Sequence, residues 1–492
     1  MGISVFVVNN KINELDLGNR TEKILLATFA ALSLLSAFGM RFCFWGDEVA
    51  TYHMVNSSWS EFWCSFAEWE PHPPLYFALL KLWSGIFGSS EIALRLPSVL
   101  LFPAIVFLTW LIAKKLGLSQ RARLVAAGLL ALHPSMWIYV RMARYYSITV
   151  LLFLVNTIIL LNAAKKGRWR WWLYAASLTL LLWTDFPAYL VIPMHLAVIL
   201  WQNRPSFKGW LLGVAVALVL AAVPLLLFAR AGFSYAEDSM PSVVSVAIGF
   251  FYSIYSFLVG EVRYPWQLPT ALALVAVVFL IIRGIVRRPK TSLILCAGPI
   301  FVGLLLLCLL FQKLPFIYYS GRFSFLFPMV ALVLGVGTEK LRMPIFIAAM
   351  VILGTGYLWG IAGVVSGKDY HNTSYVVPWK GIASDAADSG ATIAVSRDWA
   401  AVHYLNQKMD AYLPDDFREV KAPKERIAFV KRSGIRGISD IERKMYVELE
   451  GAHGEPIAHL QYVRENRILL KLKKTILKCN FPEYVVVVYI FE

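Results

Sequence analysis

The sequence predicts a polytopic α-helical membrane protein with a small extramembrane α/β domain at its C-terminus. Of the 492 residues, 58% are hydrophobic, whereas soluble domains are typically about 45–50% apolar. Apolar stretches of roughly 18–22 residues recur up to about residue 364, and each could cross a bilayer as a helix. From about residue 365 charges become frequent and short strand-like runs replace the long apolar stretches.

The apolar stretches predict a bundle of about eleven spans. They lie at 24–44, 96–113, 124–140, 147–164, 170–184, 187–202, 210–229, 266–286, 292–311, 323–338 and 344–363. Basic clusters fall on every second loop, as is typical of cytoplasmic loops. This alternation puts the N-terminus in the cytoplasm and the loop 45–95 outside. We therefore expect a transmembrane domain at 1–364, with 45–95 as its catalytic outer loop, and an extracytoplasmic α/β domain at 365–492.

Composition also excludes some classes of protein. The net charge of +16 could suggest nucleic acid as a partner, but many of the basic residues sit in short loops between spans, which is a topogenic pattern. The five cysteines are scattered without a CxxC pair or a His/Cys cluster, which argues against a structural zinc site or a disulfide framework.

The outer loop 45–95 carries the first candidate chemistry. Asp47 and Glu48 directly follow the first span, where a carboxylate is costly unless it has a partner or a function. The aromatics of Trp59–Trp69 recur at helical spacing, which predicts an amphipathic helix in the membrane interface. Leu75–Phe87 is apolar but too short to span. Asp47 could simply end a helix and face water. The aromatic helix next to it could exclude water, however, and this favours a role of Asp47 as a general base.

Basic residues on the outer side form the second candidate group. Arg141, Arg144 and Arg322 lie close to span ends on the side where positive charge is normally scarce. Each could snorkel toward lipid phosphates, but together they suit an anionic phosphate ligand, because guanidinium binds phosphate oxygens in a fork. His72 could donate to the same phosphate or bond the backbone of its own loop. Asp185, at a span end, could cap or pair.

The outer loop also carries a family resemblance. Gly46-Asp47-Glu48, then His72-Pro73-Pro74-Leu75-Tyr76, then Phe87-Gly88 and Glu91 through Ser98 occur in that order. This combination resembles the dolichyl-phosphate-mannose protein mannosyltransferase superfamily of GT-C membrane glycosyltransferases, which includes the lipid A aminoarabinose transferases. The resemblance is clearest across residues 44–150.

The resemblance implies a polyprenyl-phosphate sugar donor, a glycan, lipid or protein acceptor, and inverting transfer outside the cytoplasm. It implies that Asp47 is the general base, that Glu48 orients the site and that Arg144 holds the donor phosphate. Tyr52, His53, Tyr76 and Tyr145 are expected to line the substrate pocket. The aminoarabinose branch has a lysine where this chain has His72, so lipid A is not implied as the acceptor.

Two other classes stay open at this point. A transporter or lipid flippase would also place charges in a membrane, and a scaffold protein could use the C-terminal tail. A divalent cation is an open question, because Asp47 and Glu48 could ligate one but the sequence identifies no third ligand. No nucleic-acid partner is expected. The family resemblance favours a bacterial inner membrane as the location. Membrane lipids are then neighbours of the protein, and the active site faces the periplasm.

Overall fold

The computed structural model is mostly helical, and six of its helices are long and apolar enough to cross a membrane. The residues it describes are 19–68, 70, 72–163, 169–202, 206–224, 226, 243–289, 291, 295, 320–367, 373–376, 379–388, 392–395, 400, 403–404, 411–412, 427–433, 472–477 and 485–491. The six candidate spans are Arg20–Arg41, Glu91–Lys115, Tyr146–Ala163, Leu268–Arg287, Ser320–Gly337 and Met343–Ser366. The chain is therefore an integral membrane protein.

The chain divides into two compact units. One comprises residues 1–40 and 51–366, and the other comprises 41–50 and 367–492. The first, here called the membrane unit, contains α1 Arg20–Leu34, α3 Trp59–Glu68, α4 Leu75–Phe87, α5 Glu91–Lys115, α6 Gln120–Ala131, α7 Pro134–Tyr139, α8 Tyr146–Ala163, α9 Trp169–Leu182, α10 Val191–Gln202, α11 Phe207–Leu220, α13 Val243–Val259, α14 Leu268–Arg287, α16 Phe327–Gly337 and α17 Met343–Ser366, with the short 3₁₀ helices η1 Leu35–Arg41, η2 Pro187–Leu190 and η6 Ser320–Leu326. Helix α2, Gly46–Asn56, runs across the boundary between the two units.

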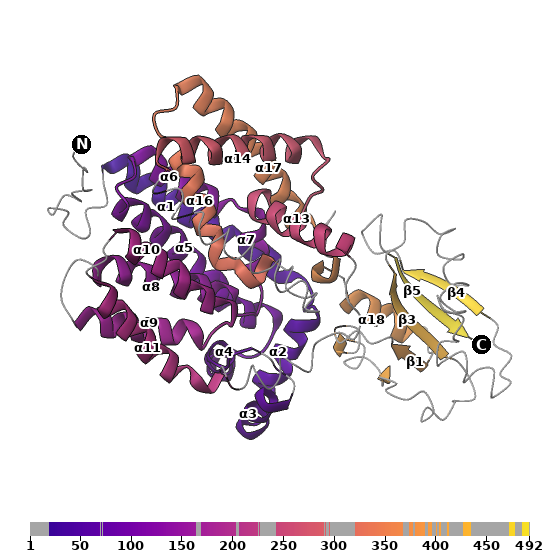
Figure 1. The fold of residues 1–492 in the computed structure, drawn as a ribbon. Coiled ribbons are helices and arrows are strands. Elements are labelled where there is room, and N and C mark those ends of the chain that lie inside the picture. Colours follow the sequence, from indigo (N-terminus) through magenta and orange to yellow (C-terminus); the bar gives the residue numbers. More distant parts are fainter. Residues whose placement is uncertain are drawn as a thin grey trace, which may run out of the picture. The chain divides into compact units, whose positions relative to one another are not determined.

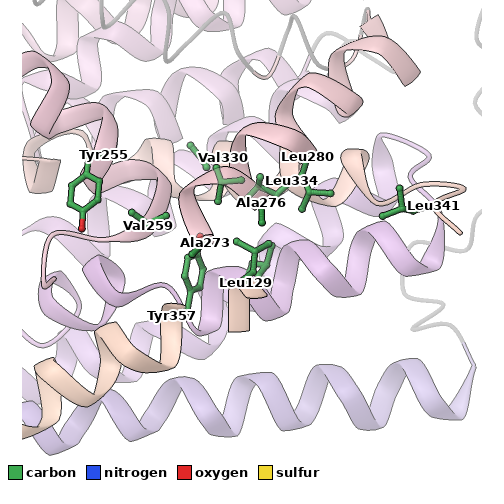
Figure 2. Close-up of a cluster of buried hydrophobic side chains, with 12 residues drawn as sticks. Leu129, Tyr255, Val259, Ala273, Ala276, Leu280, Val330, Leu334, Leu341 and Tyr357 are labelled. Atoms are coloured by element: carbon green, nitrogen blue, oxygen red, sulfur yellow. The ribbon is translucent and has the colours of Figure 1, made fainter. Parts of the chain in front are cut away.

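The helices of the membrane unit pack in two neighbourhoods (Figure 1). Helix α5 packs against α1, α6 and α8, and α8 continues the layer through α9 to α11. Helix α14 packs against both α16 and α17. Figure 2 shows the apolar cluster that joins α6, α13, α14, α16 and α17, with Leu280 and Leu334 among its fully buried members.

Two predicted features of the span pattern were wrong. The span expected at 124–140 is broken, since α6 ends at Ala131 and α7 starts at Pro134. Pro134 has no N–H to donate and disfavours a helical residue before it, so the helix restarts there. Helix α13 was not predicted at all, although its segment is apolar. The span expected at 292–311 lies outside the described residues apart from one residue.

The outer-loop helices agree with their prediction. Helix α3 runs from Trp59 to Glu68 and exposes Trp59 and Trp63, and α4 is a helix of 13 residues. Lys81 of α4 lies 5.1 Å above the Trp59 ring and 3.1 Å from the Val55 carbonyl oxygen, to which it donates. These contacts bind α3 and α4 to the end of α2 and give the outer loop a defined structure.

The second unit contains the predicted α/β domain. Its strands are β1 Thr392–Val395, β2 Ala411–Tyr412, β3 Ile427–Ser433, β4 Leu472–Leu477 and β5 Val485–Phe491, and they form one sheet in the order β2-β1-β3-β5-β4. The β1 strand pairs in parallel with β2 and β3, whereas β5 pairs antiparallel with β3 and β4. Helix α18, Trp379–Asp388, precedes the sheet in sequence.

Candidate active site

Three charged or titratable side chains meet in the membrane unit. Glu70, His72 and Arg144 are 4%, 7% and 2% exposed. One carboxylate oxygen of Glu70 bonds both the Nδ1 and the backbone N–H of His72, the latter at 3.1 Å. Its other oxygen lies 3.8 Å from Nη1 of Arg144. We call these three residues the Arg144 cluster.

Local sequence explains why Glu70 and His72 meet. They are two residues apart in sequence, so the Glu70 side chain can reach both the backbone N–H and the ring of His72. The pair also lies beside Arg144, in the turn between α7 and α8.

Arg144 is held on several sides. Its Nη1 donates to the hydroxyl of Thr51 at 3.2 Å, and its Nη2 lies 3.3 Å from Nδ1 of His72. The guanidinium also lies 5.2 Å from the ring centre of Phe77 and 5.4 Å from that of Tyr145. A buried guanidinium stacked on two rings has little rotational freedom, so its fork is oriented before a ligand arrives.

The protonation states in the cluster follow from burial and charge. Burial by itself would raise the pKa of Glu70, but His72 and Arg144 outweigh it and hold that pKa below its ordinary value. Burial lowers the pKa of His72, and Arg144 and Arg322 lower it further against the effect of Glu70. His72 is therefore a neutral imidazole. Its proton belongs on Nδ1, beside the carboxylate, while its buried Nε2 has no hydrogen-bond partner in the described part of the chain.

A second buried carboxyl group lies in the electrostatic range of the same arginines. Asp185 is fully buried. Burial raises the pKa of Asp185 well above its ordinary value, although Arg322, Arg144 and a backbone hydrogen bond from Phe186 act to lower it. A raised pKa favours the protonated carboxyl group, which can donate a hydrogen bond.

The acid pair occupies the first turn of α2. Glu48 is fully buried, and its Oε2 accepts from the Trp45 backbone N–H at 3.4 Å, so it caps the start of its own helix. Asp47 is partly exposed. Both carboxylates benefit from the positive end of the helix dipole. Thr51, the Arg144 partner, follows Asp47 by four residues and therefore lies one turn further on the same face of α2.

The other predicted site residues take different positions. Arg141 is buried and donates from Nη1 to the Gly39 carbonyl oxygen at 2.9 Å, which anchors η1. Tyr145 stacks with a ring-centre distance of 4.8 Å from His72, so it joins the Arg144 cluster. Tyr52 and His53 contact each other edge to face at 5.5 Å, and His53 is exposed. Tyr76 is buried in the first turn of α4.

Sequence reasoning missed Glu70 and Thr51 and ranked Asp185 low. The signal for Glu70 was the acid two residues before His72, across a proline. Thr51 carries no comparable signal, because its role depends on a contact with a residue 93 positions away. Among the described residues, no group of three or more His, Cys, Asp or Glu side chains could hold a metal ion.

The sequence model of the family described as dolichyl-phosphate-mannose-protein mannosyltransferase matches residues 71–228. That range includes His72, Arg144 and Asp185. A search of curated proteins gives no match to this chain.

Solved structures share the fold. ArnT from Cupriavidus metallidurans in the apo state aligns with a TM-score of 0.57 and 13% identity, over 95% of this chain and 97% of that chain. The same protein bound to undecaprenyl phosphate aligns with a TM-score of 0.53 and 12% identity, over 96% of this chain and 98% of that chain. An oligosaccharyltransferase from Archaeoglobus fulgidus, in complex with Zn and sulfate, aligns with a TM-score of 0.46 and 12% identity, over 78% of this chain and 61% of that chain. At these identities the similarity to ArnT shows a shared fold.

Proposed function

We propose that this protein transfers a sugar from a polyprenyl-phosphate donor to a hydroxyl group of a glycan, lipid or protein, with inversion at the anomeric carbon. The observation that carries the proposal is the buried Arg144 cluster, bonded to Thr51 one helical turn beyond Asp47. The similar fold of ArnT was solved with undecaprenyl phosphate bound, which supports a polyprenyl phosphate as ligand here.

The leaving group determines what the cationic side chains do. When the bond between the anomeric carbon and the phosphate oxygen breaks, the electron pair stays on oxygen and the lipid phosphate gains negative charge. Arg144, with Arg322 in electrostatic range of the same groups, would offset that charge as it develops. Cations fixed before the reaction stabilise such a transition state without reorganising.

The acceptor side requires a base. We assign this role to Asp47, which removes the proton of the acceptor hydroxyl as its oxygen attacks the anomeric carbon from the face opposite the phosphate. A single displacement inverts the configuration, whereas retention would require a second step. Glu48 contributes by capping the helix that carries Asp47.

His72 acts differently from a simple phosphate donor. Its Nδ1 proton is engaged by Glu70, which leaves Nε2 as a lone-pair acceptor. We therefore assign Nε2 to a hydroxyl group, either of the transferred sugar or of a protonated phosphate. Asp185, protonated, can donate a hydrogen bond to a phosphate oxygen. We place the reaction on the extracytoplasmic side of a bacterial inner membrane, in line with the loop charges.

The test uses the purified protein in nanodiscs with radiolabelled polyprenyl-phosphate sugars and a membrane extract as the source of acceptors. Asp47→Asn is expected to abolish transfer of label to the acceptor while Glu68→Gln, an exposed acid on α3, retains it. Near-normal turnover by Asp47→Asn would refute the base assignment. Label that crosses vesicles without changing its chemical attachment would instead indicate a transporter.

A further inference from the structure

Within the second unit, C-terminal residues contact the segment that leads into the acid pair. The Phe44 backbone N–H donates to the hydroxyl of Tyr404 at 2.6 Å, a contact between residues 360 positions apart. Both side chains are 2% exposed. An isolated buried N–H costs free energy comparable to a lost hydrogen bond, so the Tyr404 hydroxyl satisfies a group that has to be paired.

Aromatic rings reinforce this contact. The His403 ring lies 6.4 Å from that of Phe44, and the Tyr375 ring meets Trp45 edge to face at 4.9 Å. Tyr375 is itself buried. We call Tyr375, His403 and Tyr404 the aromatic clamp. Edge-to-face pairs add stability beyond the area they bury, and they restrict the orientation of both rings.

The clamped residues set the start of α2. Trp45 immediately precedes the helix, and its carbonyl oxygen accepts from the N–H groups of Glu48 at 2.9 Å and Val49 at 3.0 Å. Its own N–H bonds the Glu48 side chain. Asp47 follows Phe44 by three residues, which is at most about 11 Å of chain. A displacement of Phe44 therefore moves the first helical turn, and with it the Asp47 carboxylate.

We propose that Tyr404 is a positioning residue for the acid pair, acting through its bond to the Phe44 backbone N–H. This inference rests on the proposed role of Asp47 as base.

The decisive variant is Tyr404→Phe, which keeps the ring but leaves the Phe44 N–H without its acceptor. Because displacements of about 1 Å can cost roughly a hundredfold in rate, we expect kcat to fall about 10- to 100-fold. The donor KM and the affinity for undecaprenyl phosphate are expected to stay within about twofold, since the Arg144 cluster is untouched. The matched control is Tyr357→Phe, which removes a hydroxyl that bonds the Leu258 carbonyl oxygen at 2.9 Å inside the membrane unit and should keep its kcat.

The outcomes separate this inference from the proposed function. Normal kcat in Tyr404→Phe overturns the positioning role, and so does an equal loss of kcat and undecaprenyl-phosphate affinity, which indicates general damage. If Asp47→Asn is inactive while Tyr404→Phe is normal, only this inference fails; an active Asp47→Asn refutes the proposed function itself. Should Tyr404→Phe not fold, Tyr375→Leu removes the ring that contacts Trp45 and carries the same expectation.

Discussion

Replacing Arg144 by lysine tests the proposed donor site most directly. Lysine keeps one positive charge but offers a single ammonium group, whereas Arg144 uses Nη1 toward Thr51 at 3.2 Å and Glu70 at 3.8 Å and places Nη2 3.3 Å from His72. One ammonium group cannot occupy both positions, and it does not form the two-pronged bond that guanidinium makes with phosphate. The substitution therefore removes the fork while it preserves the local charge balance.

The magnitude follows from the lost bonds. A hydrogen bond to a charged group contributes about 1.5–3 kcal/mol, and one to two such bonds to the donor phosphate are lost. The total loss is then about 1.5–6 kcal/mol, and at about 1.4 kcal/mol per factor of ten, kcat/KM for the donor is expected to fall roughly 10- to 20,000-fold. Arg144→Met should behave worse, since removal of one partner of a buried ion pair costs about 3–5 kcal/mol of stability and leaves Glu70 with His72 alone.

The assay measures initial rates against donor concentration in nanodiscs, together with competition by undecaprenyl phosphate. The matched control is Arg263→Lys, a buried outer arginine that lies 4.2 Å from the Trp359 ring centre and bonds the Trp359 carbonyl oxygen at 3.1 Å. Arg263→Lys should retain its donor KM. If Arg144→Lys binds donor and undecaprenyl phosphate within twofold of the wild type, the assignment of Arg144 to the phosphate is wrong.

Three further substitutions test neighbouring groups. Asp185→Asn should stabilise the protein increasingly as pH rises above about 4, by at most about 1.4 kcal/mol per pH unit, because the unfolded chain then ionises while the raised pKa of Asp185 keeps the folded wild type protonated; parallel pH profiles of Tm would contradict this. Glu70→Gln should lower Tm at neutral pH, since the pKa of Glu70 is lowered by its partners. The difference in Tm between the wild type and the variant should close below about pH 4, and thermal melts at several pH values measure it. Glu261→Gln should cost about 1–3 kcal/mol, because the buried carboxylate accepts from Tyr139 at 2.7 Å and Tyr252 at 3.0 Å, and a Tm equal to that of Glu261→Asp would argue against this network.

Much of the fold could be predicted because membrane helices are specified locally. A spanning helix satisfies its own backbone groups, so its length and hydrophobicity suffice to identify it. The break before Pro134 was also readable in principle, since proline restricts the residue that precedes it. Helix α13 escaped because it has 17 residues, so a length criterion for a full span does not detect it.

The site was predictable only in part, since its members meet through long-range contacts. Asp47 and Arg144 stood out as charges at a membrane surface, which is an exceptional place for them. The contact between Arg144 and Thr51 depends on how two outer segments fold over each other. The assignment of residues 41–50 to the C-terminal unit depends on Tyr404, and no local pattern around Phe44 indicates a partner 360 residues away.

Helix α2 explains why two distant parts of the chain can bear on one reaction. Its start is fixed by the bond between Phe44 and Tyr404, and its second turn by the bond between Thr51 and Arg144. Asp47 lies between these two restraints, about 6 Å of helix rise before Thr51. Under the proposed function, loss of the two restraints should lower turnover by different routes. Loss of the bond at Thr51 should act through donor affinity, and loss of the bond at Phe44 through kcat.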